Sequence, residues 1–230
     1  MSDHMHEERP LLETRAQRAI FLSLRKREAW RLSRNGPVIW APATGGPGIL
    51  TSVVKVPVSL GAQVRDAVLP AADARQPHYV YPADDLHVTI TNLDRYQNVP
   101  LELIEEVFTD CLNRAGPINL SLRGLSISQA TIFAQVLVTP ISSLRRLRMD
   151  LWRSLEPARP LPANPVSVIG FCNALRFRHE DISAVLALAE RSADRDFGSF
   201  PINEIEIVRT DKVLSATNTI VLAKCAQTAL

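Results

Sequence analysis

The sequence predicts an α+β protein of two pseudo-symmetric lobes, and three observations lead to this fold class. The chain has 230 residues, 46% of them hydrophobic and 22% charged, which suffices for one sizeable core or one bilobal domain. Strand-like and helix-like segments alternate along it. The order β-α-β-α-β occurs twice, which indicates two similar units. We therefore expect mainly antiparallel sheets with helices on their outer faces and a central groove between the lobes.

The first part of the chain differs from the rest. We expect residues 1–46 to be an extension with one helix and a Pro/Gly linker, and residues 47–230 to be the bilobal domain. Residues 1–12 have the composition of a disordered segment, and a charged helix is predicted over 13–34, with Gly36 placed to end it. The apolar stripe of this helix is ragged, so it either packs on the first lobe or docks a partner.

Strands are expected in the two units where apolar residues alternate, and helices where they recur every three or four residues. The clearest helix signals are those of residues 100–116: a proline stands near the start, acidic residues occupy the first turn and a glycine stands at the end. The first unit comprises strands at 49–58, 85–93 and 118–128 and helices at 60–72 and 100–116. The second comprises strands at 131–140, 165–177 and 202–210, helices at 142–156 and 180–193, and a closing strand at 217–225.

Composition narrows the classes of function. No apolar run approaches the roughly 18–20 residues of a membrane span, and the polar, acidic N-terminus is unlike a secretory signal. Cys111, Cys172 and Cys225 lie far apart without a CxxC pair, which favours small core residues in a reducing cytoplasm over a zinc or disulfide framework. The net charge of +2 indicates no large basic field. Lys and Arg total 26 and four are lysines, so 22 are arginines, a bias typical of phosphate binding or of a GC-rich genome.

The segment "DDLHVTITNL", residues 84–93, carries polar side chains on one face of a predicted strand. Alternate residues of a strand share a face, so His87, Thr89 and Thr91 form a polar stripe. The opposite face points to the core and consists of Leu86, Val88 and Ile90. A histidine titrates near neutrality, and a threonine hydroxyl can donate a hydrogen bond to a charged oxygen. This pair suits a phosphodiester, although HxT alone is far more often a solvated strand face.

The motif lies in the second strand of a repeated β-α-β-α-β unit. This arrangement resembles that of the 2H phosphoesterase superfamily, which includes 2'-5' RNA ligase-like proteins and cyclic nucleotide phosphodiesterases. "YPADDLHVTITNL" is similar to the first motif of that family, and the tail "FGSFPINEIEIVRTDKVLS…TNTIVLAKC" to its closing hairpin. The resemblance covers roughly residues 47 to 226. It implies a groove with one His-x-Thr/Ser pair from each lobe, two histidines as general acid and base, no metal, and cleavage of 2',3'-cyclic phosphates or related RNA ends.

The second pair of the family pattern is missing. In "GFCNALRF", Asn173 stands at the histidine position and Leu175 at the hydroxyl position. Asparagine can bind a phosphate or a sugar but cannot transfer protons. Arg176 could replace the lost charge if a bulge turned it into the groove. His179 stands near a predicted helix start and is a weaker candidate to replace the missing histidine.

Two further aromatic residues stand near the first motif. His78 and Tyr81 precede it, where Tyr81 could stack a base or simply pack in a loop.

Three functions remain open on the sequence alone. The first is a metal-independent phosphodiesterase without a cofactor, with His87 as acid/base, Thr89 holding the phosphate, and Asn173, Arg176, Tyr81 and Thr91 contacting an RNA end or a small nucleotide. The second is a groove of the same ancestry that binds RNA or nucleotide without turnover. The third is an interaction protein that uses its N-terminal helix. A cytoplasmic location without membrane or metal partners is expected, and the oligomeric state stays open.

Overall fold

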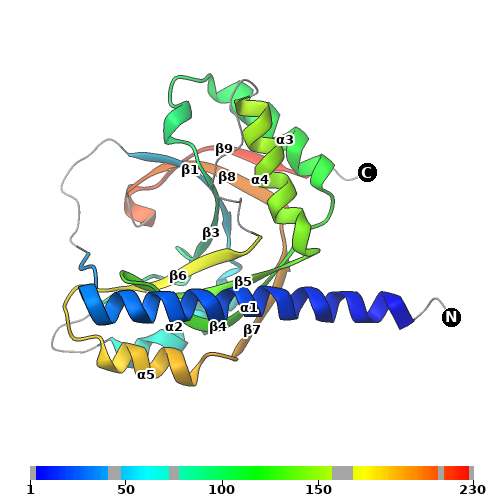
Figure 1. Cartoon of the computed structure of the whole chain (residues 1–230). Helices are drawn as coiled ribbons and strands as arrows, with labels where there is room; N and C mark the ends of the chain where they lie inside the picture. Colours follow the sequence, from blue (N-terminus) through cyan, green and yellow to red (C-terminus); the bar gives the residue numbers. More distant parts are fainter. Residues whose placement is uncertain (1–3, 41–47, 73–77, 157–167, 212–214, 228–230) are drawn as a thin grey trace.

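The strands form two antiparallel sheets (Figure 1). The computed structural model describes residues 4–40, 48–72, 78–156, 168–211 and 215–227. The first sheet has the strand order β3-β1-β8-β9 and the second β2-β6-β5-β4-β7. The strands are β1 (Ile49–Lys55), β2 (Tyr79–Val80), β3 (His87–Asn92), β4 (Asn119–Ile127), β5 (Thr131–Thr139), β6 (Gly170–Arg176), β7 (Asp196–Pro201), β8 (Glu204–Thr210) and β9 (Ile220–Ala226). The helices are α1 (His4–Asn35), α2 (Val58–Val68), α3 (Leu101–Ala115), α4 (Ile141–Leu155) and α5 (Ser183–Arg191), with short 3-10 turns at Leu69–Ala71, Asp94–Tyr96 and Ala216–Asn218.

The expected two-lobed α+β fold is confirmed, but the sheets do not divide at the midpoint of the chain. β4, from the first half, lies in the second sheet, and β8 and β9, from the second half, complete the first. β4 and β5 are joined by only three residues, and such a short connection makes them antiparallel neighbours. β2 and β7 were not expected, because β2 has two residues and β7 contains both a glycine and a proline.

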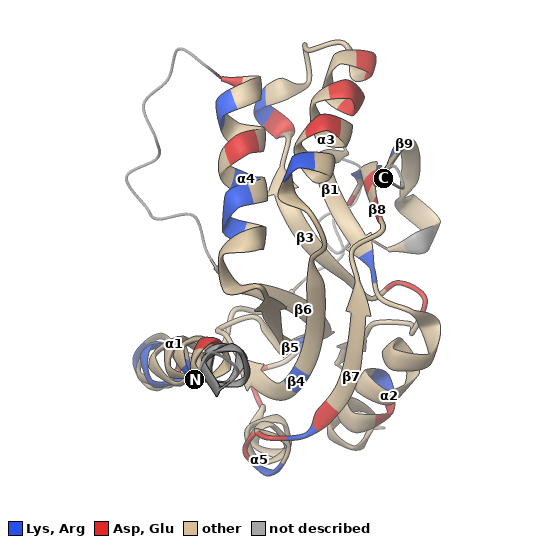
Figure 2. Cartoon of the chain, turned by 90° about the vertical axis from the view of Figure 1, so that its right-hand side faces the viewer, with Lys and Arg blue, Asp and Glu red and all other residues tan. Residues whose placement is uncertain are grey.

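Helices cover both sheets (Figure 2). α3 and α4 lie side by side, with α3 on β9 of the first sheet and α4 against β5 of the second. The apolar faces of both helices belong to the main core. α2 and α5 contact β6, β7 and β4 of the second sheet. Within the described ranges, no helix has the length and apolar character that crossing a membrane would require.

α1 packs on the second sheet rather than on the first lobe, and it begins at His4 instead of near residue 13. The side chain of Gln17 donates to the carbonyl of Val138 at 2.9 Å and accepts from its N–H at 2.7 Å, where β6 no longer runs beside β5. Phe21 packs against Phe133 and Leu137, on the face of β5 opposite to the main core. The helix ends as expected, with the N–H of Gly36 donating to Leu32.

The two sheets meet where β3 runs close to β6. The N–H of His87 donates to the thiol of Cys172, and burial raises the pKa of that thiol to about 12. A Cβ at Gly170 would lie 3.0 Å from Val88 and 3.1 Å from Val136, so any larger residue would push on these two side chains. Arg148 of α4 donates across this junction to the carbonyls of Ile90 at 2.9 Å and Ile169 at 2.9 Å.

Candidate functional site

His87 is buried in the neutral form. Its side chain is 3% exposed, and Nδ1 lies 2.7 Å from the carbonyl oxygen of Asp85. Since a carbonyl only accepts, Nδ1 carries the hydrogen and Nε2 carries the lone pair. Burial lowers the pKa of His87 to about 4; the Asp85 carbonyl raises it, and the charges of Lys55 and Arg176 lower it. Nε2 is therefore a proton acceptor at neutral pH.

A β-bulge interrupts the polar stripe on β3. Val53 of β1 pairs with Thr89, but the next residue, Ser52, pairs with Thr91, so Ile90 is the extra residue. Paired residues share a face of the sheet, so Thr91 turns to the face opposite to Thr89. The prediction that all three polar residues line one groove is therefore wrong for Thr91. His87 and Thr89 keep a common face, with Cβ atoms about 7 Å apart along the strand.

A second bulge, in β6, changes the face of Arg176. Phe133 of β5 pairs with Asn173, whereas Thr131 pairs with Arg176, so Ala174 is the extra residue. Arg176 thus reaches the face that carries Asn173. This bulge is the condition under which the sequence predicts that Arg176 reaches the Asn173 face. Its Nε donates to the hydroxyl of Tyr81 at 2.7 Å. Leu175, at the hydroxyl position of the family pattern, is fully buried.

Tyr81 does not fit the expected stacking role. Its side chain is 1% exposed and its ring packs edge-on against Tyr79 and His87, with centroids 5.1 Å and 6.3 Å away. Burial is the largest influence on the pKa of Tyr81, which rises to about 12, so the hydroxyl stays protonated beside Arg176. A base has no open face of this ring to stack on. Tyr81 instead contacts the ring of His87 and fixes Arg176.

Thr89 and Asn173 line one cavity of about 350 Å³, near the lower end of the range for small-molecule sites. The hydroxyl residues Ser128 and Thr131 also line it. The side chains of Thr89 and Asn173 have no hydrogen-bond partner within the part of the chain that the structure describes, so both have polar atoms left for a ligand. The apolar wall consists of Leu24, Phe133 and Phe171.

No protein-family model matches this sequence, and no curated protein matches it significantly. Among solved structures, one described as a phosphoesterase aligns with a TM-score of 0.51 at 14% identity, over 80% of this chain and 100% of that chain. E. coli LigT in complex with NADP+ aligns with a TM-score of 0.53 at 15% identity and the same coverage. TT0787 of Thermus thermophilus aligns with a TM-score of 0.50 at 19% identity, over 77% and 97% of the two chains.

This chain has the LigT-like phosphoesterase fold. The resemblance expected from "YPADDLHVTITNL" is thereby confirmed at the level of the fold. The two strands that carry the motif positions of the family, β3 and β6, run close together as that resemblance implies.

α1 brings two charged residues to the cavity of Thr89 and Asn173, called the groove from here on, and the sequence did not point to them. Arg27 and Glu28 line the same cavity as Thr89 and Asn173. Glu28 is 7% exposed, and its Oε1 accepts from Arg27 Nε at 3.1 Å and from Arg31 Nη1 at 3.0 Å. The only signal in the sequence was the adjacent opposite charges in "RKREAWR", which a solvated helix face shows as well.

The other candidate histidines lie together in a different place. The rings of His78 and His179 stack with centroids 3.9 Å apart, and His78 also contacts Phe177. Nδ1 of His78 accepts from the N–H of Arg178 at 3.3 Å. Neither histidine lines the cavity of Thr89 and Asn173. The Arg27–Glu28 pair of α1 thus lines the cavity of Thr89 and Asn173, and no histidine is among the described residues that line it. His87 lies two residues along β3 from Thr89 and is 3% exposed.

Proposed function

We propose that this protein is a phosphodiesterase that opens 2',3'-cyclic phosphates on small nucleotides or short RNA ends without a metal. One observation carries the proposal: Thr89, Asn173 and Arg27 converge on one cavity, two residues along β3 from a neutral histidine. E. coli LigT has been solved with 3'-AMP and with phosphate, at TM-scores of 0.50 and 0.51, which supports a nucleotide phosphate as the ligand.

In the proposed reaction, Nε2 of His87 takes a proton from water while the water oxygen bonds to phosphorus. The bond from phosphorus to one ribose oxygen breaks, and that oxygen takes a proton from solvent. Thr89 and Asn173 donate hydrogen bonds to the remaining phosphate oxygens. Because burial lowers the pKa of His87 to about 4, the ring is neutral at neutral pH and its Nε2 lone pair is available to accept the proton.

Arg27 takes the place of the missing second histidine in this proposal. A guanidinium cannot transfer a proton at neutral pH, but it stabilises negative charge on the leaving oxygen. Glu28 holds Arg27 through its Nε, which leaves the two terminal nitrogens of the guanidinium for a phosphate. α1 would thus supply electrostatically what β6 no longer supplies by acid–base chemistry.

The test is turnover of 2',3'-cyclic AMP and of a short RNA with a 2',3'-cyclic end, measured in EDTA. We expect His87→Ala to lower the rate about 10²–10⁴-fold, as loss of a general base does. Arg27→Gln should lower it about tenfold or more. Arg15→Gln, an exposed position on the same helix outside the cavity, is the matched control and should keep the wild-type rate. Equal rates for wild type and His87→Ala would refute the proposal.

The alternative is a nucleotide-binding protein without turnover, and Asn173 at the second motif position favours it. The same cyclic nucleotide would then bind saturably, with affinity reduced in Thr89→Val and Asn173→Leu, and no product would form. Product formation that depends on His87 excludes this alternative.

A further inference from the structure

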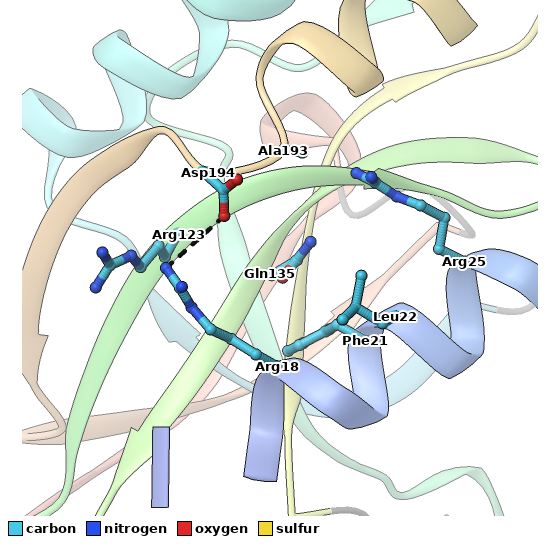
Figure 3. A pocket seen from close by; sticks show the side chains of 8 residues that line it. All are labelled: Arg18, Phe21, Leu22, Arg25, Arg123, Gln135, Ala193 and Asp194. Atoms are coloured by element: carbon cyan, nitrogen blue, oxygen red, sulfur yellow. Dashed lines mark ion pairs between the residues drawn. The ribbon is translucent and has the colours of Figure 1, made fainter. Parts of the chain in front are cut away.

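A second cavity lies on the other side of α1, away from Thr89 and Asn173. It has a volume of about 250 Å³ and is enclosed by α1, β4, β5 and the segment after α5 (Figure 3). α1 faces the groove with Leu24, Arg27 and Glu28 and faces this second cavity with a different set of side chains. The lining residues are Arg18, Phe21, Leu22, Arg25, Arg123, Gln135, Ala193 and Asp194.

Three arginines line this cavity, whereas Asp194 supplies the only carboxylate among the described residues that line it. Arg18 and Arg123 lie on one side of Gln135 and Arg25 on the other (Figure 3). Arg25 donates to the carbonyl of Leu125 at 3.0 Å, and at 3.4 Å to that of Ala189, so backbone atoms hold its guanidinium in place. Cations held close together by neutral partners leave a positive potential that an anion would neutralise.

The positive charge of the arginines is poorly compensated. Nε of Arg123 is buried and has no hydrogen-bond partner within the described residues. The carboxylate of Asp194 is 3.9 Å from Arg18 Nη2, and its side chain is 89% exposed. An ion pair this long and this exposed contributes little, about 1 kcal/mol at most. A buried guanidinium N–H without an acceptor is costly, so an incoming acceptor would be strongly favoured.

Gln135 is a second, independent sign of a ligand. It lies in the middle of β5 and is only 8% exposed, yet its amide has no hydrogen-bond partner within the described part of the chain. Buried side-chain amides are normally satisfied. Gln135 points into the cavity between the arginines (Figure 3). Its NH₂ group can donate to the same oxygen-rich anion that the arginines would bind.

We propose that this cavity binds the phosphate group of a small phosphate monoester. Several guanidinium and amide donors approaching from different directions suit a tetrahedral dianion with many acceptor oxygens. Phe21, Leu22 and Ala193 form an apolar wall for the organic part of the ester. When the phosphate binds, Arg18 gives up its 3.9 Å ion pair with Asp194 and donates to a phosphate oxygen instead. The site does not depend on the proposed phosphodiesterase activity, because none of its residues lines the groove.

The test uses the intact protein and reads the Nε–H signal of Arg123 by NMR while inorganic phosphate or 5'-AMP is added. Adenosine, and chloride at equal ionic strength, serve as the ligand controls. We expect a saturable shift with phosphate and with 5'-AMP, tighter for 5'-AMP because of the apolar wall. Arg18→Gln should weaken both affinities about tenfold or more. Arg15→Gln removes the same charge from the exposed side of α1 and should leave them unchanged.

A groove-site variant separates the two cavities. Thr89→Val should leave the Arg123 signal and its saturation unchanged, since Thr89 lines only the groove. Three outcomes would overturn the proposal: no shift with phosphate or 5'-AMP, the same response to chloride, or a shift that disappears in Thr89→Val. If the Arg123 signal responds as expected but no cyclic phosphate is turned over, the proposed phosphodiesterase activity is refuted and the proposed phosphate site is retained.

Discussion

The Nδ1 atom of His87 donates to the main-chain carbonyl of Asp85 across 2.7 Å, two residues earlier in the chain. This contact sets the tautomer and the orientation of the ring, while burial keeps the ring neutral by lowering its pKa to about 4. The same environment that makes Nε2 a base at neutral pH therefore opposes protonation when the solution turns acidic.

The low pKa of His87 predicts a loss of stability in acid. The folded-state pKa of about 4 lies below the unfolded value of 6.5, so the unfolded chain binds more protons between these pH values. Stability should therefore be unaffected by this group above pH 6.5 and fall by about 3 kcal/mol as the pH drops to 4. Urea unfolding of wild type and His87→Gln at pH 7.5, 5.5 and 4.5 measures this. The variant should lose less stability than wild type over this range; parallel curves would contradict the prediction.

Arg148 should be a major link between the two sheets. Its guanidinium donates to the carbonyls of Thr89, Ile90 and Ile169 at 3.0, 2.9 and 2.9 Å, and burial lowers its pKa to about 10, so it remains charged at neutral pH. Arg148→Met removes these three hydrogen bonds and should cost about 3 kcal/mol in chemical unfolding. Arg146→Met, on the exposed side of the same helix, is the control and should change stability by less than about 0.5 kcal/mol. Similar losses in both variants would argue against the link.

Gln17 should hold α1 on the second sheet. Gln17→Leu keeps the size of the side chain but removes both hydrogen bonds to the backbone of Val138. Burial of an unpaired N–H and C=O costs about 2 kcal/mol, so amide exchange along α1 should accelerate about 30-fold. Hydrogen exchange followed by mass spectrometry measures this, with Gln63→Leu on the exposed face of α2 as the control. Unchanged protection of the α1 amides would show that the apolar contacts of Phe21 and its neighbours are enough to hold α1 on the second sheet.

Two glycines with similar φ angles should respond differently to alanine. Gly116 (φ +70°) has open space where a Cβ would be, whereas a Cβ at Gly124 (φ +76°) would collide with the carbonyl oxygen of Ala193. Gly116→Ala should cost about 1 kcal/mol through its backbone angle alone. Gly124→Ala should cost about 3 kcal/mol, since the collision adds to it. Thermal unfolding compares them, and equal shifts in melting temperature would reject the steric argument.

The local pattern on β3 was enough to predict a strand with His87 and Thr89 on one face, because strand alternation is a property of the segment itself. Thr91 was misplaced because the bulge at Ile90 depends on how β1 pairs with β3. The bulge in β6, which turns Arg176 to the face of Asn173, depends likewise on the pairing of β6 with β5. Strand pairing is a tertiary relationship, and a single sequence carries no direct trace of it.

The contribution of α1 was beyond sequence reasoning for a related reason. Arg27 and Glu28 stand on a helix whose apolar stripe is weak, so periodicity does not show which face docks. Docking is decided by Phe21 against Phe133 and by Gln17 against Val138, residues more than 100 positions apart. Tyr81 was misjudged in the opposite direction: an aromatic residue near a groove is as well suited to its core as to its surface, and only its burial distinguishes the two.

The attachment of Gln17 to Val138 also bears on the order in which the protein takes shape during synthesis. α1 leaves the ribosome before the strand that receives it, and 121 positions separate these two residues. Until β5 exists, Phe21 and Leu24 have no apolar partner, and the nascent helix presents them to solvent. At translation rates of about 5–20 residues per second, this interval lasts at least several seconds. The groove can therefore gain its helical wall only late, after the sheets behind it have begun to form.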